Sequence, residues 1–268
     1  MKLVVCVKQV PDSSDIRWTE KNTMQREGME SIINPFDEFA LETALRIKDQ
    51  IPGVEITTIS MGPMQAVDML KRTIAHGADK AVLLSDRKFA GADTYATSKT
   101  LAYAIKKEIP DFALIICGQF ATDGDTGQTG PAMATFLNIP QITYVKNVIV
   151  ENNTLFFEKE TETHIEKLKL NSPGLICTLK TDFYLRPALI DGYRKAAKAD
   201  VKILSATDIE IPFEEIGFKG SPTCVSKAFR PEVKQQGEVV KRANSTGYAM
   251  FLNDKVKELK ERFFINEQ

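Results

Sequence analysis

Gly118-Gln-Phe-Ala-Thr-Asp-Gly-Asp-Thr-Gly-Gln-Thr-Gly130 is the stretch of this sequence that decides both its fold and its site. The apolar run at residues 112–117 is typical of a buried strand, and Pro131 opens a segment with helical spacing of its apolar residues. The order is therefore strand, glycine-rich turn and helix start. Free N–H groups at a helix start attract anions, and glycines let a ligand approach the backbone, so the turn predicts a phosphate-bearing nucleotide.

Two carboxylates, Asp123 and Asp125, stand within this turn and would repel a phosphate. They are therefore assigned to the sugar or base edges of the ligand, or to fixing the turn. The turn is not a P-loop, which needs a lysine followed by Ser or Thr at the helix start, and it lacks the spacing of dinucleotide-binding glycines. An ordinary turn rich in capping residues is the alternative, because Gly, Asp and Thr all favour turns and caps.

The composition excludes several classes of protein. There are 35 basic and 36 acidic residues among 268, and the net charge of −1 gives no electrostatic basis for binding nucleic acid or an anionic membrane. No apolar run approaches the roughly 20 residues that span a bilayer, and residues 1–7 read as a strand, not a signal peptide. We therefore expect a cytoplasmic protein that binds neither nucleic acid nor membrane.

Cysteine and histidine, the usual metal ligands and nucleophiles, are few and scattered. The four cysteines stand at 6, 117, 177 and 224 without a Cys-x-x-Cys pair, and the two histidines stand at 76 and 164. Buried reduced thiols are expected in place of disulfides or a metal cluster. We expect no metal site and no catalytic set of side chains, so any chemistry would belong to a cofactor.

Short apolar strands alternate with amphipathic helices through the first half of the chain. Strands are expected at 2–7, 54–59, 81–84 and 112–117, and helices at 38–50, 64–75, 94–109 and 131–137. This alternation predicts an α/β fold with a doubly wound, mostly parallel, Rossmann-like sheet. Ligands of such sheets bind beyond the carboxyl ends of the strands, which gathers the loops at 6–12, 34–37, 61–63, 91–97 and 118–130 along one edge.

The second half of the sequence changes character. Residues 143–150, 154–160 and 163–170 alternate in polarity and predict an antiparallel hairpin meander, and Ile16 and Trp18 predict a further hairpin before residue 33. The basic segment 186–198 is interpreted as a solvated helix or an exposed arm. The expected domains are a nucleotide-binding core with its hairpin at 1–200, an extended tether at 201–240, and a C-terminal helix at 241–268 that packs on a partner subunit or a mobile domain.

Several motifs together resemble one protein family. Cys6-Val-Lys-Gln-Val-Pro-Asp12, Asn34-Pro-Phe-Asp-Glu-Phe-Ala-Leu-Glu42 and the Asp123-Gly-Asp-Thr-Gly-Gln128 turn resemble the small (beta) subunit of electron-transfer flavoproteins. Shorter matches are Met61-Gly-Pro63, Gly77-Ala-Asp79, Gly91-Ala-Asp-Thr94, Lys195-Ala-Ala-Lys198 and Gly220-Ser-Pro-Thr223. The resemblance covers nearly the whole chain.

The resemblance implies a heterodimer with a larger alpha subunit, which carries an FAD in a mobile domain. It also implies a nucleotide pocket in the α/β core of this chain, with AMP in housekeeping members and a second FAD, reduced by NADH, in electron-bifurcating members. The matching cofactor-binding positions are Cys6, Lys8, Asn34, Pro35, Phe36, Asp37, Met61, Gly62, Thr94, Thr97, Thr122, Asp123, Gly124, Asp125, Thr126, Gly127, Gln128 and Thr129. Backbone amides from Gly124 to Gln128 are expected on the diphosphate, so Gly124 should exclude a β-branched side chain.

Three features resemble the electron-bifurcating branch: the Val10-Pro-Asp12 ending of the first loop, Gly124 between two carboxylates, and Gly220-Ser-Pro-Thr223. That branch implies FAD in the pocket, one electron for ferredoxin, and one electron that passes through the alpha-subunit FAD to an acyl-CoA dehydrogenase- or reductase-type partner. The stretch Thr181-Asp-Phe-Tyr-Leu-Arg-Pro187 departs from the family's partner-recognition arm, which leaves the docking dehydrogenase open.

The alternatives come from other classes of protein. One is a non-bifurcating beta subunit with structural AMP, and another is a nucleotide-binding protein of the same fold without a redox role. A stand-alone enzyme is the third, and the missing acid, base or nucleophile set argues against it.

Overall fold

The computed structural model describes residues 1–12, 31–170, 172–225, 241 and 244–263. The chain divides into two units, Met1–Ala228 and Phe229–Gln268. The hairpin expected at Ile16 and Trp18 lies outside the described residues.

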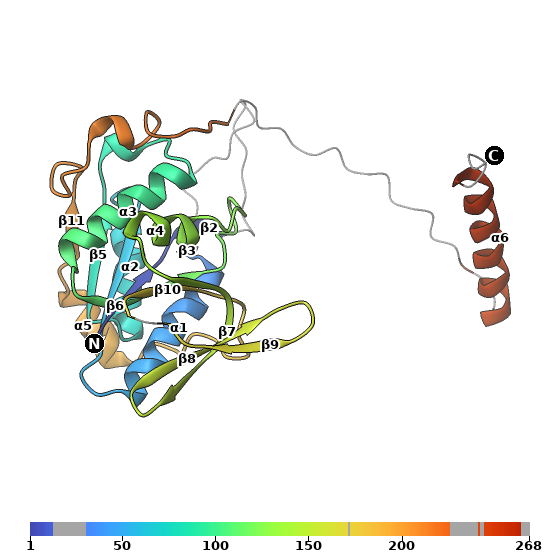
Figure 1. The fold of residues 1–268 in the computed structure, drawn as a ribbon, viewed down its shortest axis with the longest axis horizontal. Coiled ribbons are helices and arrows are strands. Elements are labelled where there is room, and N and C mark those ends of the chain that lie inside the picture. Colours follow the sequence, from blue (N-terminus) through green and yellow to red (C-terminus); the bar gives the residue numbers. More distant parts are fainter. Residues whose placement is uncertain (13–30, 171, 226–240, 242–243, 264–268) are drawn as a thin grey trace. The chain divides into compact units, whose positions relative to one another are not determined.

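In the described residues, the first unit is built on a nine-stranded sheet in the order β11-β5-β4-β1-β6-β10-β7-β8-β9 (Figure 1). Neighbours pair in parallel from β11 to β7, namely β11 (Lys202–Leu204), β5 (Lys80–Leu84), β4 (Glu55–Met61), β1 (Lys2–Cys6), β6 (Phe112–Gly118), β10 (Gly174–Thr178) and β7 (Gln141–Glu151). β8 (Thr154–Glu160) and β9 (Ile165–Leu168) continue the sheet antiparallel. The expected α/β fold with a mostly parallel sheet and an antiparallel hairpin is confirmed.

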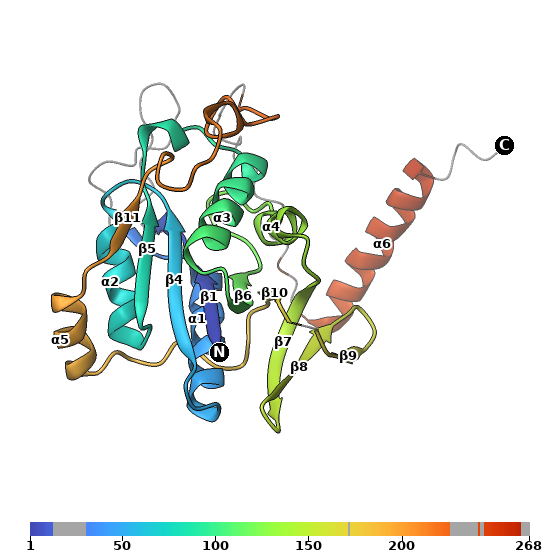
Figure 2. The same ribbon diagram turned by 60° about the vertical axis from the view of Figure 1, so that its left-hand side comes forward.

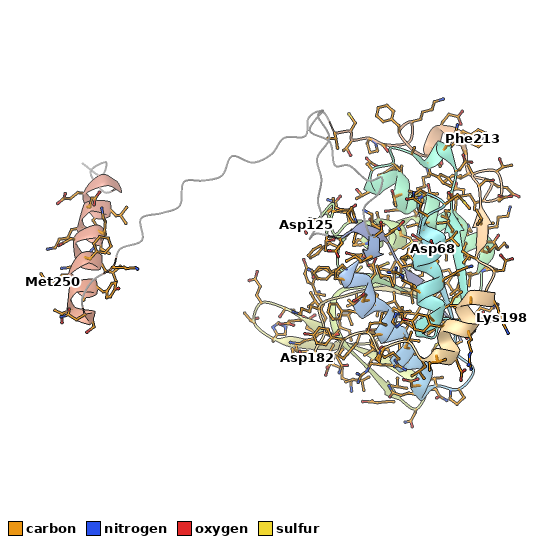
Figure 3. All side chains as sticks on the ribbon, turned by 180° about the vertical axis from the view of Figure 1, so that it is seen from behind. Asp68, Asp125, Asp182, Lys198, Phe213 and Met250 are labelled. Carbon is orange, nitrogen blue, oxygen red and sulfur yellow. The ribbon has the colours of Figure 1, made fainter. Side chains whose placement is uncertain are left out.

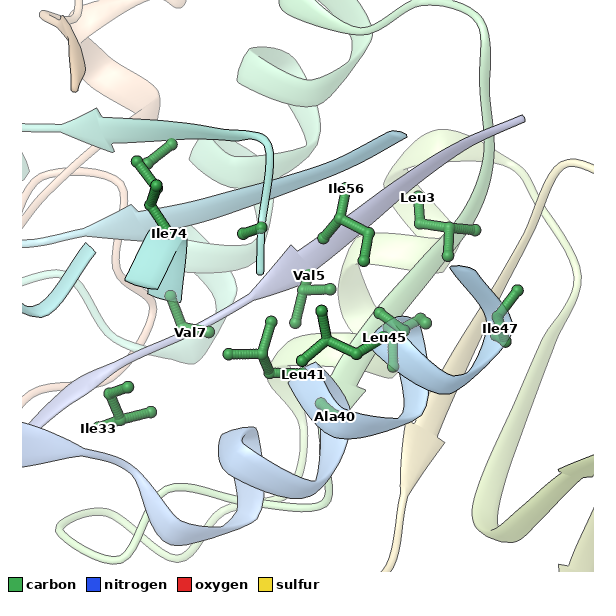
Figure 4. Packing of buried hydrophobic residues seen from close by; sticks show 14 of the residues in the cluster. Leu3, Val5, Val7, Ile33, Ala40, Leu41, Leu45, Ile47, Ile56 and Ile74 are labelled. Atoms are coloured by element: carbon green, nitrogen blue, oxygen red, sulfur yellow. The ribbon is translucent and has the colours of Figure 1, made fainter. Parts of the chain in front are cut away.

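Helices cover both faces of this sheet (Figure 2). α1 (Pro35–Gln50), α2 (Ala66–His76) and α5 (Ile190–Lys198) share one core cluster, and α3 (Thr94–Glu108) and α4 (Thr129–Leu137) share the other. Successive side chains of a strand point to opposite faces, so β1 sends Leu3 and Val5 toward α1 and Val4 toward α3. Figure 4 shows Leu3 and Val5 packed near Leu41 and Leu45 of α1.

Helix starts lie close to the positions that the sequence predicts. α1 begins at Pro35, whose missing N–H is harmless in the first turn, and α3 begins after Asp93, whose carboxylate caps the N–H of Ala96 at 3.0 Å. The helix after the glycine-rich turn begins at Thr129, two residues before Pro131. A short antiparallel ladder of β2 (Gln9–Pro11) and β3 (Ser31–Ile33) leads into α1.

The segment 201–225 differs from the expected extended tether. β11 adds an edge strand beside β5, a 3-10 turn follows at Phe213–Glu215, and Ile209, Ile211 and Ile216 are buried in the core cluster beneath α3. These apolar residues are too widely spaced to show strand or helix periodicity, so the sequence did not indicate their burial. The first unit therefore extends to Ala228 and not to residue 200.

The basic segment 186–198 begins as a surface arm and continues as a helix from Ile190. Residues 179–189 form no helix or strand, and Arg186 fastens them to α1 through Glu42, with Nη2–Oε1 at 2.9 Å, and through Asp49, with Nη2–Oδ2 at 2.7 Å. α5 follows, and its Ala196 is buried beside α2. The Arg186 pairs explain how a segment without helix or strand keeps one position on the surface.

The second unit contains α6 (Ser245–Phe263), whose Met250, Leu252 and Leu259 are exposed. Among the helices that the structure describes, none has the length and apolar character needed to cross a bilayer.

Candidate functional site at the carboxyl edge of the sheet

The direction of the chain through the sheet reverses at β1. β1 leads through α1 to β4 and through α2 to β5, and α3 then returns the chain to β6 on the other side of β1. The carboxyl ends of β1 and β6 are therefore the topological switch point, where ligands of doubly wound sheets bind. The glycine-rich turn, residues 118–130, follows β6 at this point.

Asn34 ties the glycine-rich turn to the end of β1. Its side chain is fully buried; Nδ2 donates to the carbonyl of Phe120 at 2.9 Å, and Oδ1 accepts from the N–H of Thr122 at 3.1 Å. Its own N–H donates to the carbonyl of Lys8 at 2.9 Å. A buried amide with these bonds fixes two loops that are far apart in sequence, because each unmade bond would leave a buried polar group without a partner.

Asp37 makes a second link between the same two loops. Its Oδ2 accepts from the N–H of Lys8 at 2.7 Å, and the N–H of Gly118 and the side chain of Asn34 also donate to the carboxylate. Burial raises the pKa of Asp37 to about 7, although these hydrogen bonds and the charge of Lys8 oppose the rise. Gly118 has no space for a side chain, because a Cβ would collide with Asp37 Oδ1 and with the carbonyl of Phe36.

The remaining two residues of the Asn34–Asp37 motif are Pro35 and Phe36, and Phe36 contacts the glycine-rich turn. Pro35 begins α1, and the ring of Phe36 lies 4.0 Å from the ring of Phe120, centroid to centroid. The sequence places this motif at the cofactor, and in the structure its side chains hold the turn against β1.

The carboxylate of Asp123 is neutralised by a lysine. Nζ of Lys8 lies 2.6 Å from Asp123 Oδ1, and the Asp123 side chain is only 13% exposed. An unpaired carboxylate here would repel a phosphate. The positive charge of Lys8 reduces this repulsion between Asp123 and an anionic ligand. Asp125 is exposed and has a left-handed backbone, with φ 50°.

The start of α4 offers backbone donors. Gln128, the N-cap, makes no side-chain cap, and no described residue accepts a hydrogen bond from the N–H of Thr126, Gly127 or Gln128. Together with the positive end of the helix dipole, these donors suit a phosphate or diphosphate. The chemistry of the donor set therefore fits the nucleotide portion of FAD or AMP.

The residue of this turn whose backbone requires glycine is Gly127, whereas the sequence pointed to Gly124. Gly127 has φ 62°, which a β-branched side chain resists, whereas Gly124 has no left-handed backbone and open space around its Cβ position. Asp125 and Gly127 supply the left-handed conformations of this turn, so the backbone at Gly124 gives no reason to exclude a β-branched side chain there.

The face covered by α3 and α4 holds the other expected positions. Thr94 Oγ1 donates to Gln128 Oε1 at 3.3 Å, which joins the starts of the two helices, and Ser98 Oγ donates to the carbonyl of Thr129 at 3.0 Å. Cys6 and Met61, at the ends of β1 and β4, pack against the core cluster of this face. Thr97 lies one turn into α3 and Gly62 follows Met61, so the expected residues gather around one edge from both faces of the sheet.

Asp93 is a residue of this edge that sequence reasoning missed. Besides capping α3, its Oδ2 accepts from Thr223, at 3.0 Å from N and 2.7 Å from Oγ1, and its N–H donates to Ser221 Oγ at 2.8 Å. An Asp before a helix signals a cap. Its bonds to Gly220-Ser-Pro-Thr223, 130 residues away, have no local signal, and they bring that motif to the start of α3.

One cavity adjoins the glycine-rich turn, and another lies at the opposite end of the sheet. A cleft of about 420 Å³ borders Asp125, Thr126 and Gly127 on the β7 side, and a cavity of about 630 Å³ lies at the amino ends of the strands, where Lys198 is one lining residue. Figure 3 labels Asp125 and Lys198 in these separate regions. The larger cavity has no glycine-rich turn, so its size alone does not make it the candidate site.

Thiols and possible metal ligands in the described part of the chain form no further site. Cys117 and Cys177 are buried on neighbouring strands, and hydrogen bonding to Cys117 together with burial raises the pKa of Cys177 well above its usual value. No group of three or more His, Cys, Asp or Glu residues in the described ranges is arranged to bind a metal ion.

Comparison with known proteins places this geometry in a family. Residues 21–209 match the electron transfer flavoprotein domain. The electron transfer flavoprotein subunit beta of Clostridium acetobutylicum is 44% identical over 266 residues, 99% of this chain and 100% of that protein. The subunit beta of Megasphaera elsdenii is 43% identical over 247 residues (90% and 92%), and the caffeyl-CoA reductase-Etf complex subunit CarD of Acetobacterium woodii is 40% identical over 259 residues (96% and 98%). This chain therefore belongs to the electron transfer flavoprotein family, as a beta subunit.

Proposed function

We propose that this beta subunit binds FAD at the carboxyl edge of its sheet, accepts electrons from NADH and bifurcates them. The observation that carries the proposal is the group of N–H donors at Thr126, Gly127 and Gln128, which no described residue engages, beside an Asp123 carboxylate that Lys8 neutralises. These donors suit the phosphates of FAD or AMP, and the sequence features that resemble the electron-bifurcating branch favour FAD. When bound, FAD would supply the step between two-electron and one-electron chemistry.

The residues of this chain bind and orient the cofactor in this proposal. The Asn34–Asp37 motif holds the glycine-rich turn, the start of α4 binds the diphosphate, and the hydroxyls of Thr94 and Thr97 border the cofactor on the α3 side. No side chain is needed as a general acid or base, which agrees with the chemistry of a hydride-accepting cofactor.

The partners follow from the electron balance. NADH gives up two electrons; one passes to ferredoxin, and the other passes through the alpha-subunit FAD to an acyl-CoA dehydrogenase- or reductase-type flavoenzyme. The Acetobacterium woodii relative is named as a subunit of a caffeyl-CoA reductase-Etf complex, which supports a partner that acts on a CoA ester. An alpha subunit bound to α6 would bury the exposed apolar residues of this helix.

The test is a cofactor count on the purified heterodimer. We expect two FAD and no AMP per heterodimer after denaturation and chromatography, and bleaching of flavin absorbance when NADH is added to the intact complex. A Lys198→Ala variant, at the opposite end of the sheet, should keep both cofactors. One FAD with one AMP would overturn the bifurcating assignment and favour the AMP-holding type of beta subunit.

A further inference from the structure

We propose that Asp37 is a positioning residue of the nucleotide site, whose ionised carboxylate holds the ends of β1 and β6 together and so strengthens nucleotide binding. From the proposed function, this inference takes only the location of the nucleotide site at the carboxyl edge of the sheet. It applies equally to FAD and to AMP.

The carboxylate of Asp37 is surrounded by donors. The N–H of Lys8 donates at 2.7 Å from the end of β1, the N–H of Gly118 donates from the end of β6, and the side chain of Asn34 donates from the residue before α1. A carboxylate has only acceptor sites, which suits three N–H groups. A protonated carboxyl would add an O–H among these donors and weaken the contacts with Lys8 and Gly118.

The two backbone amides that Asp37 holds belong to the two loops of the switch point. Lys8 continues to Asp123 through its side chain, and Gly118 opens the turn that carries the donors at Thr126–Gln128. A change at Asp37 therefore acts on the relative position of both loops. Because α1 covers the face of the sheet opposite to α4, Asp37 acts through these loops and does not itself touch the phosphates.

Among the described residues, the charged and titratable groups around Asp37 come from β1, β6, β10, α1 and α2. The ammonium of Lys8, which Asp123 also engages, favours the ionised carboxylate, and the charge of Asp37 helps to raise the pKa of the thiols of Cys117 on β6 and Cys177 on β10. Glu38, the next residue of α1, is half-buried and lies near His76 of α2. Burial raises the pKa of Asp37 to about 7, so the group titrates in the physiological range.

The sign of the pH effect follows from these contacts. The ionised form predominates above pH 7 and makes all three hydrogen bonds, so nucleotide affinity should rise with pH through this value. Repulsion between the Asp37 carboxylate and a bound phosphate would give the opposite slope. The direct bonds should dominate, because the sheet separates Asp37 from the start of α4.

The experiment measures nucleotide binding to the cofactor-depleted heterodimer between pH 6 and pH 8, with FAD followed by fluorescence and AMP by calorimetry. We expect the wild-type affinity to rise roughly tenfold across this range. Asp37→Asn keeps the shape but not the charge; we expect roughly tenfold weaker binding at pH 8 and, with FAD, little slope. With AMP, whose phosphate has a second pKa of about 6, only the slope due to the phosphate should remain. Asp111→Asn, an exposed carboxylate paired with Lys2 away from the site, should behave as the wild type.

Two results would overturn the proposal. One is an unchanged pH slope in Asp37→Asn, and the other is a wild-type affinity that falls as pH rises. If Asp37→Asn fails to fold, infrared difference spectra of the wild type decide the matter, since nucleotide binding at pH 7 should remove a protonated-carboxyl band. A cofactor count that finds AMP in place of FAD would defeat the bifurcating function and leave this test intact, because the slope is read with either nucleotide.

Discussion

Nζ of Lys8 lies 2.6 Å from Oδ1 of Asp123, so one ion pair joins the end of β1 to the glycine-rich turn across the switch point. The lysine is 47% exposed and the aspartate 13%, which makes the pair worth less than about 1 kcal/mol to folding. Its larger effect is on the ligand, because it cancels a negative charge beside the expected phosphates.

Replacing this lysine should therefore weaken nucleotide binding more than it weakens the fold. We expect Lys8→Met to lower nucleotide affinity roughly tenfold, since Asp123 is left unpaired, and Lys8→Met with Asp123→Asn to recover most of the loss. Calorimetric titration of the four proteins in the double-mutant cycle measures this coupling. Simple addition of the two single effects would show that the residues act independently.

The glycines of the turn should respond differently to the same substitution. Gly127→Val forces a β-branched residue to φ 62°, at a cost of about 1–2 kcal/mol, and should greatly reduce nucleotide content. Gly124→Val meets open space and should retain the nucleotide. Absorbance of the purified variants after desalting gives the comparison, and the reverse order would mean that the phosphates approach the backbone at Gly124.

The start of α4 depends on the absence of a side chain at Gly130. A Cβ there would lie 2.5 Å from Sγ of Cys177, and its next neighbours are 3.5 Å away or more. We expect Gly130→Ala to destabilise the protein by about 1–3 kcal/mol through overpacking. Adding Cys177→Ala should recover part of this loss in a urea unfolding experiment, and equal stability of the single and double variants would contradict the contact.

Asp79 should give a pH-dependent contribution to stability. Although its burial opposes this, its pKa is lowered below the usual 3.8 by Lys48, at 2.7 Å, and by the N–H of Ile56, at 2.8 Å. The folded state therefore favours the ionised form, and the stabilisation is present above pH 4 and lost as pH falls through the lowered pKa. Asp79→Asn should cost about 1 kcal/mol at pH 7, allowing for solvent screening, and little at pH 3; urea unfolding at both values checks this.

The chain expressed without an alpha subunit should aggregate. Leu252, Val256 and Leu259 recur at helical spacing on one face of α6 and are each 48–61% exposed, and such a row of apolar side chains calls for a covering surface. We expect sedimentation to show aggregates for the chain alone and a discrete heterodimer on co-expression. Replacing Leu252 and Leu259 by Ser should reduce aggregation and weaken the heterodimer, and a well-behaved wild-type monomer would refute the idea.

The elements of this fold with strong periodicity could be predicted from the sequence. Strand β6 and the turn after it were recognised because an apolar run, glycines and a helix start follow one another without interruption. β11 could not be recognised, since only Leu204 of its three residues is buried and its pairing with β5 depends on contacts more than 100 residues apart.

The site shows the same division between local and distant information. The sequence brings Asn34 and Asp37 to the correct edge, because residues after neighbouring strands must meet there. It does not show that their polar atoms bond to Phe120, Thr122 and Lys8. Only the three-dimensional arrangement separates residues that hold the turn from residues that remain open to a ligand.

The contact between Gly130 and Cys177 also restricts the order in which substitutions can accumulate. Alanine at position 130 costs stability while position 177 keeps its sulfur, whereas Cys177 can be replaced by alanine without this clash while glycine remains at 130. Among descendants of this sequence, the two changes should therefore appear in one order. A lineage with alanine at 130 and cysteine at 177 would be expected only if the first turn of α4 had moved away from β10.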